Sequence, residues 1–280
     1  MTNGRNRMKI GQREFDFNHK TYVMGILNVT PDSFSDGGRY NRMESALQHA
    51  EQMILEGADV IDVGGESTRP GFVPVSDQEE IERTVPVIEK IRRNFDIPIS
   101  IDTCKSTVAK EAIAAGADLV NDIWGLKSDA DLAGIIAHAG VCCCLMHNRS
   151  QVQEHPYGDF MKDLISDLQE TVCIAERAGI GQDRILLDPG IGFAKTYENN
   201  LEAIRCLEQL HVLGYPVLLG TSRKSVIGLT LDLPADSRLE GTLVTTVLAV
   251  EKQCAFVRVH DVKENVRAVR MAEAILYRAE

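Results

Sequence analysis

Short apolar runs recur along nearly the whole chain, and longer segments with a helical pattern separate them. The apolar runs predict strands at residues 22–28, 60–63, 97–102, 119–122, 141–146, 184–188, 217–220 and 256–260. The intervening segments carry apolar residues at helical spacing, as at 43–56, 77–94, 105–115 and 159–178. Strand–helix alternation of this kind implies parallel strands joined by helical crossovers.

Eight such units in 280 residues fit an α/β fold of the (β/α)8 TIM-barrel type. The main alternative, a doubly wound open sheet, usually carries a G-x-G-x-x-G turn after its first strand, and no such turn follows residue 28. Residues 9–17 alternate apolar and polar and predict a short N-terminal β-hairpin over the bottom of the barrel. No Pro- or Ser-rich linker divides the chain, so we expect a single domain over 1–280, with residues 1–8 as a flexible tail.

Charge and cysteine content narrow the class of protein. The net charge of -11 argues against a general nucleic-acid footprint, and no apolar stretch reaches membrane-spanning length. The seven cysteines are odd in number and lack zinc-site spacing. The run Cys142-Cys143-Cys144 lies in a predicted strand, whose neighbouring side chains point to opposite faces and cannot converge on one metal. Reduced, buried thiols favour a cytoplasmic protein.

Polar residues gather where the predicted strands end. In a (β/α)8 barrel this end forms the active-site face, and buried carboxylates and amides need partners. For any single residue a structural role, such as a helix cap or a turn, is an alternative. The residues at the strand ends are Asn28, Asp62, Asp102, Asn121, Met146, His147, Asp188, Gly220, Arg258 and His260.

Two polar, glycine-rich loops follow early strands. The first strand ends at Asn28 and opens into Thr-Pro-Asp-Ser-Phe-Ser-Asp-Gly-Gly, which is typical of a scaffold leading into an active-site loop. The second loop, 64–71, carries Arg69. Asn28 could serve as an oxygen ligand for magnesium, because this ion is held by few protein oxygens together with water and phosphate.

Cationic residues lie near the last two strands. Thr221 or Ser222 could cap a short helix whose free N–H groups attract an anion. Arg258 and His260 alternate in the last predicted strand and so share a face, which suggests an anion site; a single ion pair is the alternative for Arg258. The residues alone therefore propose a barrel mouth that accepts a small polar heterocycle bearing a phosphate ester.

Several of these segments, taken in order, resemble signatures of the dihydropteroate synthase family. The similarity runs over residues 8–275, and its first two motifs are long. The segments that carry it are 24–38, 59–71, 100–103, 120–123, 187–193, 220–224 and 258–262.

This resemblance implies a transferase of folate biosynthesis. It would join 6-hydroxymethyl-7,8-dihydropterin pyrophosphate to p-aminobenzoate, releasing pyrophosphate and 7,8-dihydropteroate with the help of Mg2+. The pterin edge offers adjacent N–H donors that a carboxylate can pair with bidentately. The resemblance also implies a homodimer through outer helices and an enzyme that sulfonamides target.

The resemblance assigns roles residue by residue. The pterin would be bound by Asp102, Asn121, Ile123, Met146, Asp188, Phe193, Gly220, Lys224 and Arg258. The p-aminobenzoate would be bound by Phe34, Thr68, Pro70 and Ser222. The pyrophosphate would be held by Asn28 through magnesium, Arg69, Arg258 and His260. The catalytic set would be Asp36, Arg69, Asp102, Lys224, Arg258 and His260.

Two other functions fit part of this pattern. A pterin-binding methyltransferase domain would share the pterin carboxylate and amide, but it would not need Arg258 and His260 or the loop after Asn28. A binding paralogue without turnover would show damage in the loops or the anion site, and the sequence shows none. Release of pyrophosphate only with both substrates and magnesium separates the synthase from both.

Overall fold

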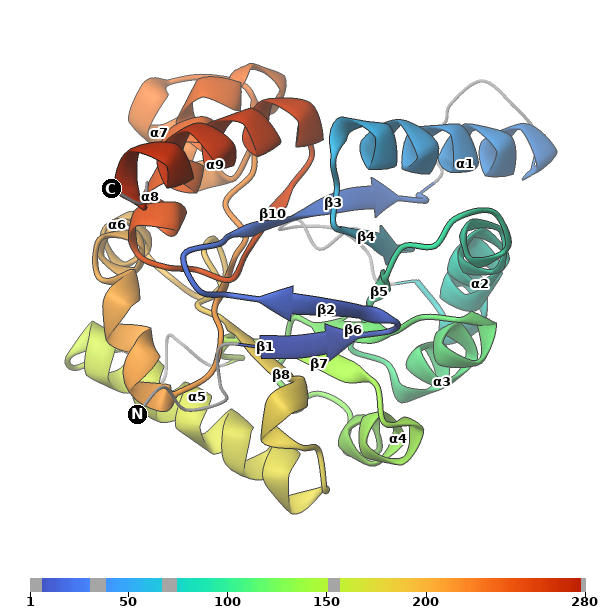
Figure 1. Cartoon of the computed structure of the whole chain (residues 1–280). Coiled ribbons are helices and arrows are strands. Elements are labelled where there is room, and N and C mark those ends of the chain that lie inside the picture. Colours follow the sequence, from blue (N-terminus) through green and yellow to red (C-terminus); the bar gives the residue numbers. More distant parts are fainter. Residues whose placement is uncertain (1–6, 31–38, 67–74, 151–156, 278–280) are drawn as a thin grey trace.

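The computed structural model describes residues 7–30, 39–66, 75–150 and 157–277. Within them, eight parallel strands form one sheet in the spatial order β8-β7-β6-β5-β4-β3-β10-β9. A bridge between Leu187 and Val217 joins β8 to the residue before β9, so the sheet is a nearly closed barrel. Helices surround the strands, and the predicted (β/α)8 barrel is confirmed (Figure 1).

The strands lie close to their predicted positions, two of them with the same bounds. Their bounds are β3 Tyr22–Asn28, β4 Val60–Gly64, β5 Ile99–Asp102, β6 Leu119–Asp122, β7 Cys142–Met146, β8 Ile185–Asp188, β9 Leu218–Leu219 and β10 Phe256–Val259.

The helices pack their apolar faces on the outside of the barrel. Helix α2 shows why they form: Ser76 caps its first turn by accepting a hydrogen bond from the Glu79 N–H, and Arg92 and Arg93 lie in its last turn, where the helix dipole favours cations. The α-helix bounds are α1 Arg39–Glu56, α2 Asp77–Asn94, α3 Ser106–Ala115, α4 Leu132–Ala139, α5 Phe160–Arg177, α6 Tyr197–Arg205, α7 Ser225–Leu231, α8 Leu239–Glu251 and α9 Val262–Leu276, with short 3-10 turns η3 Gln182–Arg184, η4 Leu207–Leu213 and η5 Ala235–Ser237. None of the helices in these ranges is both long and apolar enough to cross a lipid bilayer.

The predicted hairpin closes one end of the barrel, in front of the strands in Figure 1. Strands β1 (Arg7–Ile10) and β2 (Arg13–Asp16) pair antiparallel. Met8 and Phe15 are buried against the lower barrel interior, which includes Phe256. The expected tail over residues 1–8 was therefore too long, because Met8 finds an apolar site and the strand begins before it.

The cysteine run divides between the two sides of its strand. Cys142 and Cys144 lie in the core inside the barrel, whereas Cys143 lies in the core between strands and helices. Successive strand residues point to opposite faces, so this confirms the prediction that the three thiols do not converge.

Candidate active site at the carboxyl ends of the strands

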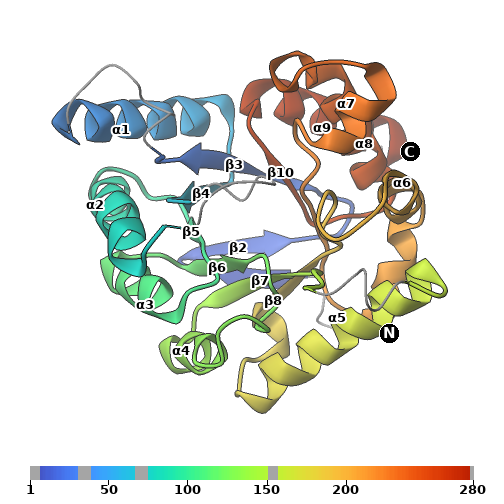
Figure 2. The ribbon, with the colours of Figure 1, turned by 180° about the vertical axis from the view of Figure 1, so that it is seen from behind.

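Strand register places the first site residues in one row. Asn28 pairs with Gly64, Gly64 with Asp102, and Asp102 with Asn121, on four neighbouring strands. A β-carbon on Gly64 would lie 3.4 Å from Asn28 Oδ1 and 3.6 Å from Asp102 Cβ, so these two side chains flank the glycine. Figure 2 shows the molecule from the side opposite the hairpin, where this row lies at the barrel mouth.

Arg258 joins two carboxylates of this mouth. Its Nε donates to Asp62 Oδ2 and its Nη2 donates to Asp102 Oδ2, both at 2.5 Å. The suggested single ion pair is thus a double one, reaching from β10 past β3 to β4 and β5. Asp102 does not cap α3, whose N-cap residue is Lys105.

Burial raises the pKa of Asp102 to about 7, against the opposing charge of Arg258. Asp62 adds a second negative charge and raises the same pKa further. For Arg258, burial lowers the pKa, but Asp62 and Asp102 outweigh burial and the net pKa is raised. The mouth therefore holds a permanent cation between two carboxylates, one of which titrates near neutrality.

Asp62 has a structural role in the mouth that the sequence analysis did not predict. It is fully buried, and its Oδ2 also accepts a hydrogen bond from Asn121 Nδ2 at 3.3 Å. Its Oδ1 has no hydrogen-bond partner within the described residues. A signal was available in Val-Ile-Asp-Val-Gly, because a charged residue inside a buried strand requires a partner.

Asp188 ends β8, at the same carboxyl end of the barrel as Asp102 and Asn121. Its Oδ1 accepts a hydrogen bond from Gly190 N at 2.6 Å, so the suggested turn is present. Its Oδ2 would lie 3.5 Å from a β-carbon on Gly220, and Lys224 Nζ would lie 3.8 Å from the same point. Gly220 thus leaves space between a carboxylate at the end of β8 and a cation just before α7.

Lys224 lies among the site residues. Its Nζ donates to Ile191 O at 2.5 Å and lies 4.8 Å from the centre of the Phe193 ring. Burial lowers the pKa of Lys224 to about 8, while the charge of Asp188 opposes this shift. The group is therefore a cationic donor at neutral pH that loses its charge in mild alkali.

Ser222 and His260 lie together beside this region. His260 Nδ1 is 3.0 Å from Ser222 Oγ, and the His260 N–H donates to the same oxygen at 3.1 Å. His260 follows the end of β10 rather than lying within it.

The expected helix cap at Thr221 or Ser222 was wrong. The N-cap residue of α7 is Lys224, and the hydroxyl of Thr221 instead contacts Thr245 Oγ1 at 2.6 Å. Arg223 pairs with Asp261 through two hydrogen bonds, the longer at 3.0 Å, so its charge is engaged within the protein.

The remaining predicted residues divide into two groups. Met146 is buried and pairs in register with Asp188, and the half-buried Ile123 directly follows β6, so both lie at the same end of the barrel. The other group lies outside the described residues. It comprises Phe34, Asp36, Thr68, Arg69 and Pro70.

The donor set at Asn28 fits a magnesium ion. Its amide oxygen lies at the mouth, beside a glycine and near the Asp102 carboxylate. In the described part of the chain no group of three or more His, Cys, Asp or Glu could hold a metal. Magnesium takes few protein oxygens and completes its shell with water and phosphate, so one amide oxygen is a ligand of the kind that it accepts.

Comparison with known proteins gives the class. A family model described as a pterin binding enzyme matches residues 24–260. The chain therefore belongs to the family of pterin-binding enzymes.

Curated relatives narrow the class. The chain is 57% identical to the dihydropteroate synthase of Clostridium beijerinckii over 272 residues, which is 97% of this chain and 100% of the relative. It is 54% identical to that of Bacillus subtilis over 260 residues, which is 93% and 90% of the two chains. These relatives place it among the dihydropteroate synthases, which are transferases of folate biosynthesis.

Solved structures agree with this placement. The dihydropteroate synthase of Clostridium difficile, crystallised in the presence of pteroic acid, has a TM-score of 0.90 at 50% identity, over 95% of this chain and 100% of that one. The Xanthomonas albilineans synthase with 4-aminobenzoic acid has a TM-score of 0.92 at 38% identity, over 98% and 100%. The Yersinia pestis synthase with a sulfonamide drug has a TM-score of 0.89 at 42% identity, over 96% and 98%.

Proposed function

We propose that the barrel mouth binds 6-hydroxymethyl-7,8-dihydropterin pyrophosphate and joins it to p-aminobenzoate. The observation that carries this proposal is the placement of Asp188 and Lys224 on either side of Gly220, where a carboxylate and a cation face one narrow space. A pterin presents adjacent N–H donors beside a ring oxo group, so it needs an acceptor and a donor at this spacing.

Each side chain of the mouth binds a different part of the pterin ring. Asp188 accepts from the amino edge, Lys224 donates to the oxo group and a ring nitrogen, and Asn121 binds the remaining edge. Asp102 contacts the far side of the ring. Arg258, fixed by Asp62 and Asp102, stacks its planar cation over the ring face. Ile123, Met146 and Phe193 wall the slot.

Pyrophosphate leaves from the outer part of the same mouth. Asn28 would hold magnesium, and the ion would neutralise charge on the leaving group. Arg258 and His260 bind the pyrophosphate oxygens, together with Arg69. The bond between the pterin methylene carbon and the pyrophosphate oxygen breaks, and the electron pair leaves with the oxygen. Asp102 stabilises the pterin cation electrostatically.

The arylamine then attacks the cation. Its nitrogen lone pair forms the new C–N bond, and the aryl ammonium product releases a proton to solvent, so no general base is required. Ser222 binds the p-aminobenzoate carboxylate, with Phe34, Thr68 and Pro70 around its ring. Asp36 and Arg69 complete the catalytic set from the first two loops. The aryl acid and sulfonamide complexes of the solved relatives support this second substrate and a sulfonamide-sensitive site.

Assembly and location complete the proposal. The chain works as one domain over 1–280 and forms a homodimer through α7 and α8, supported by the exposed apolar side chains of Leu229, Leu231, Val244 and Val247 on these neighbouring helices. A cytoplasmic location is supported by seven free cysteines, which suit a reducing compartment.

Pyrophosphate release tests the proposal. The purified protein is incubated with pterin pyrophosphate, p-aminobenzoate and magnesium, and each is omitted in turn. Release is expected only with all three. Pterin binding without release would indicate a binding protein, and binding of methyltetrahydrofolate with indifference to p-aminobenzoate would indicate a methyltransferase.

A further inference from the structure

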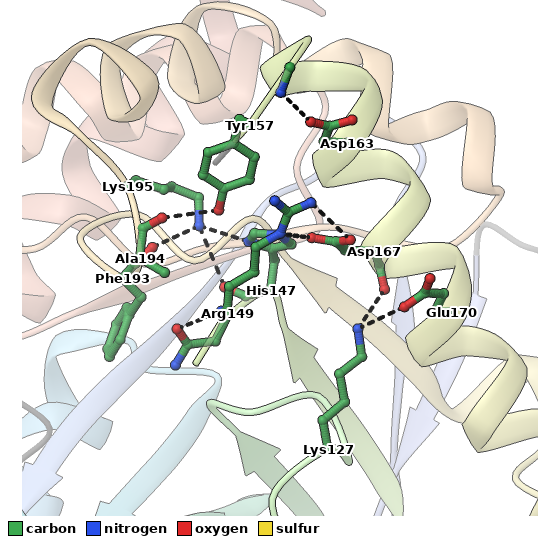
Figure 3. A network of polar contacts seen from close by, with 12 residues as sticks. Lys127, His147, Arg149, Tyr157, Asp163, Asp167, Glu170, Phe193, Ala194 and Lys195 are labelled. Carbon is green, nitrogen blue, oxygen red and sulfur yellow. Dashed lines mark hydrogen bonds and ion pairs between the residues drawn. The ribbon is translucent and has the colours of Figure 1, made fainter. Parts of the chain in front are cut away.

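A polar network adjoins the proposed pterin slot through the main chain of Phe193, and its other residues have no role above. Its centre is Lys195, a partly buried residue between β8 and α6. Lys195 Nζ is 2.9 Å from His147 Nδ1, donates to Phe193 O at 3.0 Å and approaches His147 O at 3.5 Å. One amino group thus contacts the main chain that follows β7 and the main chain that follows β8 (Figure 3).

His147 is itself held in place. It is 2% exposed, and its Nε2 lies 2.8 Å from Asp167 Oδ2 on α5. Burial lowers the pKa of His147 to about 4, so the ring is neutral at pH 7. Burial raises the pKa of Asp167, but His147 and Arg149 outweigh burial and the net pKa is lowered, so its carboxylate can only accept. The ring proton therefore resides on Nε2, and Nδ1 accepts from Lys195. The lysine therefore binds a ring whose tautomer and position are both set.

A second tie joins the same loops from the other side. Arg149 Nε donates to Asp167 at 2.6 Å, and its guanidinium carbon lies 4.2 Å from the Tyr157 ring centre. Tyr157 Oη then donates to Ala194 O at 3.0 Å. Residues 193 and 194 are thus held by Lys195 at one carbonyl and by Tyr157 at the next.

The two loops also approach closely at Gly190. A β-carbon there would lie 2.1 Å from His147 O, and the residue has φ +70°, so only glycine fits. Gly190 N is also the donor to Asp188 Oδ1. The position of the Asp188 carboxylate therefore depends on the packing of the loop after β8 against His147.

We propose that Lys195 is a positioning residue of the pterin slot: its amino group ties the main chain after β7 to the main chain after β8 and so holds Asp188 and Phe193 in the geometry that receives the ring. This inference rests on the proposed function, because Asp188 and Phe193 are assigned to the pterin there. Lys195 itself contacts neither the ring nor the reacting atoms.

The charge of Lys195 adds a second effect. Burial lowers the pKa of Lys195 to about 7, with Asp188 and Asp167 opposing this shift and Lys224 and Arg149 adding to it. Either form of the amine can donate to Phe193 O, so the tie persists on both sides of this pKa. Burial raises the pKa of Asp188, and the charged lysine counters this rise. Removing the lysine is therefore expected to raise the pKa of Asp188 further.

The test is Lys195→Met, with Lys127→Met as the matched control. Lys127 belongs to the same network, where its amino group donates to Asp167 O at 3.2 Å and contacts Glu170 at 3.5 Å, both on α5 and away from the main chain after β7 and β8. For Lys195→Met we expect a roughly tenfold rise in KM for pterin pyrophosphate and a KM for p-aminobenzoate within about twofold of wild type. We also expect the loss of pterin affinity at acid pH to begin at a higher pH than in the wild type. The control is expected to match wild type in all three.

Tyr157→Phe keeps the test decisive if Lys195→Met fails to fold. It removes only the hydroxyl that holds Ala194 and retains the ring beside Arg149, so we expect a rise of about threefold in the same KM. Wild-type pterin affinity in the folded variants, or equal losses for both substrates, would overturn the inference. Absence of pterin binding by the wild-type protein would instead overturn the proposed function.

Discussion

Arg258 reaches from β10 past β3 to Asp62 on β4, donating from Nε to Oδ2 at 2.5 Å, although the two residues are far apart in sequence. Asp62 is fully buried, and its oxygen is shared with Asn121. The two hydrogen-bonded carboxylates hold the guanidinium in place, and under the proposed function this pair preorganises the pterin site before substrate arrives.

Asp62→Asn should therefore destabilise the protein. Removing one charge of a buried ion pair costs about 3–5 kcal/mol, and we expect the lower end of that range because Arg258 retains Asp102. Urea denaturation at pH 7 measures the loss. Asp16→Asn is the control, since Asp16 pairs with Arg7 on the exposed hairpin, and its effect should be small. Similar losses for the two variants would contradict a buried structural role for Asp62.

Asp188→Asn should weaken pterin binding by at least about tenfold, because a charged hydrogen bond contributes about 1.5–3 kcal/mol and the amide turns one acceptor into a donor. Calorimetry with the pterin substrate measures this. Asp183→Asn, at the other end of the same strand region, should bind as wild type. Unchanged affinity of the Asp188 variant would count against its role in the slot.

Ser222→Ala should act on the other substrate. Loss of one hydrogen bond to the charged carboxylate, worth about 1.5–3 kcal/mol, predicts a rise of at least about tenfold in KM for p-aminobenzoate, with little change for pterin pyrophosphate. Steady-state kinetics with each substrate varied in turn separates the two. Ser225→Ala, an exposed serine at the start of α7, is the matched control. Equal losses for both substrates would show that the aryl acid binds elsewhere.

Alkaline pH should weaken pterin binding through Lys224. Its pKa is lowered to about 8, so the donor is charged below that pH and loses its charge as pH rises through it. We expect kcat/KM for pterin pyrophosphate to fall above about pH 8. Lys224→Arg, whose guanidinium stays charged, should start from a lower value but show no such fall. A fall of the same size in this variant would show that a group other than Lys224 causes the loss of kcat/KM at alkaline pH.

Gly190→Ala should damage both stability and pterin affinity. The added carbon would meet His147 O in a backbone conformation that disfavours alanine, and we expect a loss of about 2 kcal/mol or more. Thermal denaturation checks this. Gly134→Ala in α4 has open space around it and should instead stabilise by about 0.5–1 kcal/mol. A harmless Gly190→Ala would mean that the two loops do not approach as described.

Much of the fold was predictable from the local pattern of apolar and polar residues. The strand over Tyr22–Asn28 and the helix over Asp77–Asn94 were predictable because a buried strand reads as a continuous apolar run and an amphipathic helix repeats with its own period. The segment Gly-Ala-Asp occurs twice, at 57–59 and 116–118, just before β4 and β6, and it shows the limit of such reasoning. Asp59 and Asp118 each accept a hydrogen bond from the N–H of a neighbouring strand, Val23 and Ile99, and this partner is not visible in the repeat itself.

The sequence by itself determined the alternation of strands and helices, the polar residues at the strand ends and the family, because these depend on local periodicity and on motif order. Which side chains form hydrogen bonds and ion pairs with one another depended on the tertiary structure. Three pairings or positions depend on the register and closure of the barrel: Arg258 bridges Asp62 and Asp102, Lys224 rather than Ser222 is the N-cap residue of α7, and Lys195 contacts His147. The physical reason is that hydrogen bonds and ion pairs act over a few ångströms, so distant segments interact only once the sheet has brought them together.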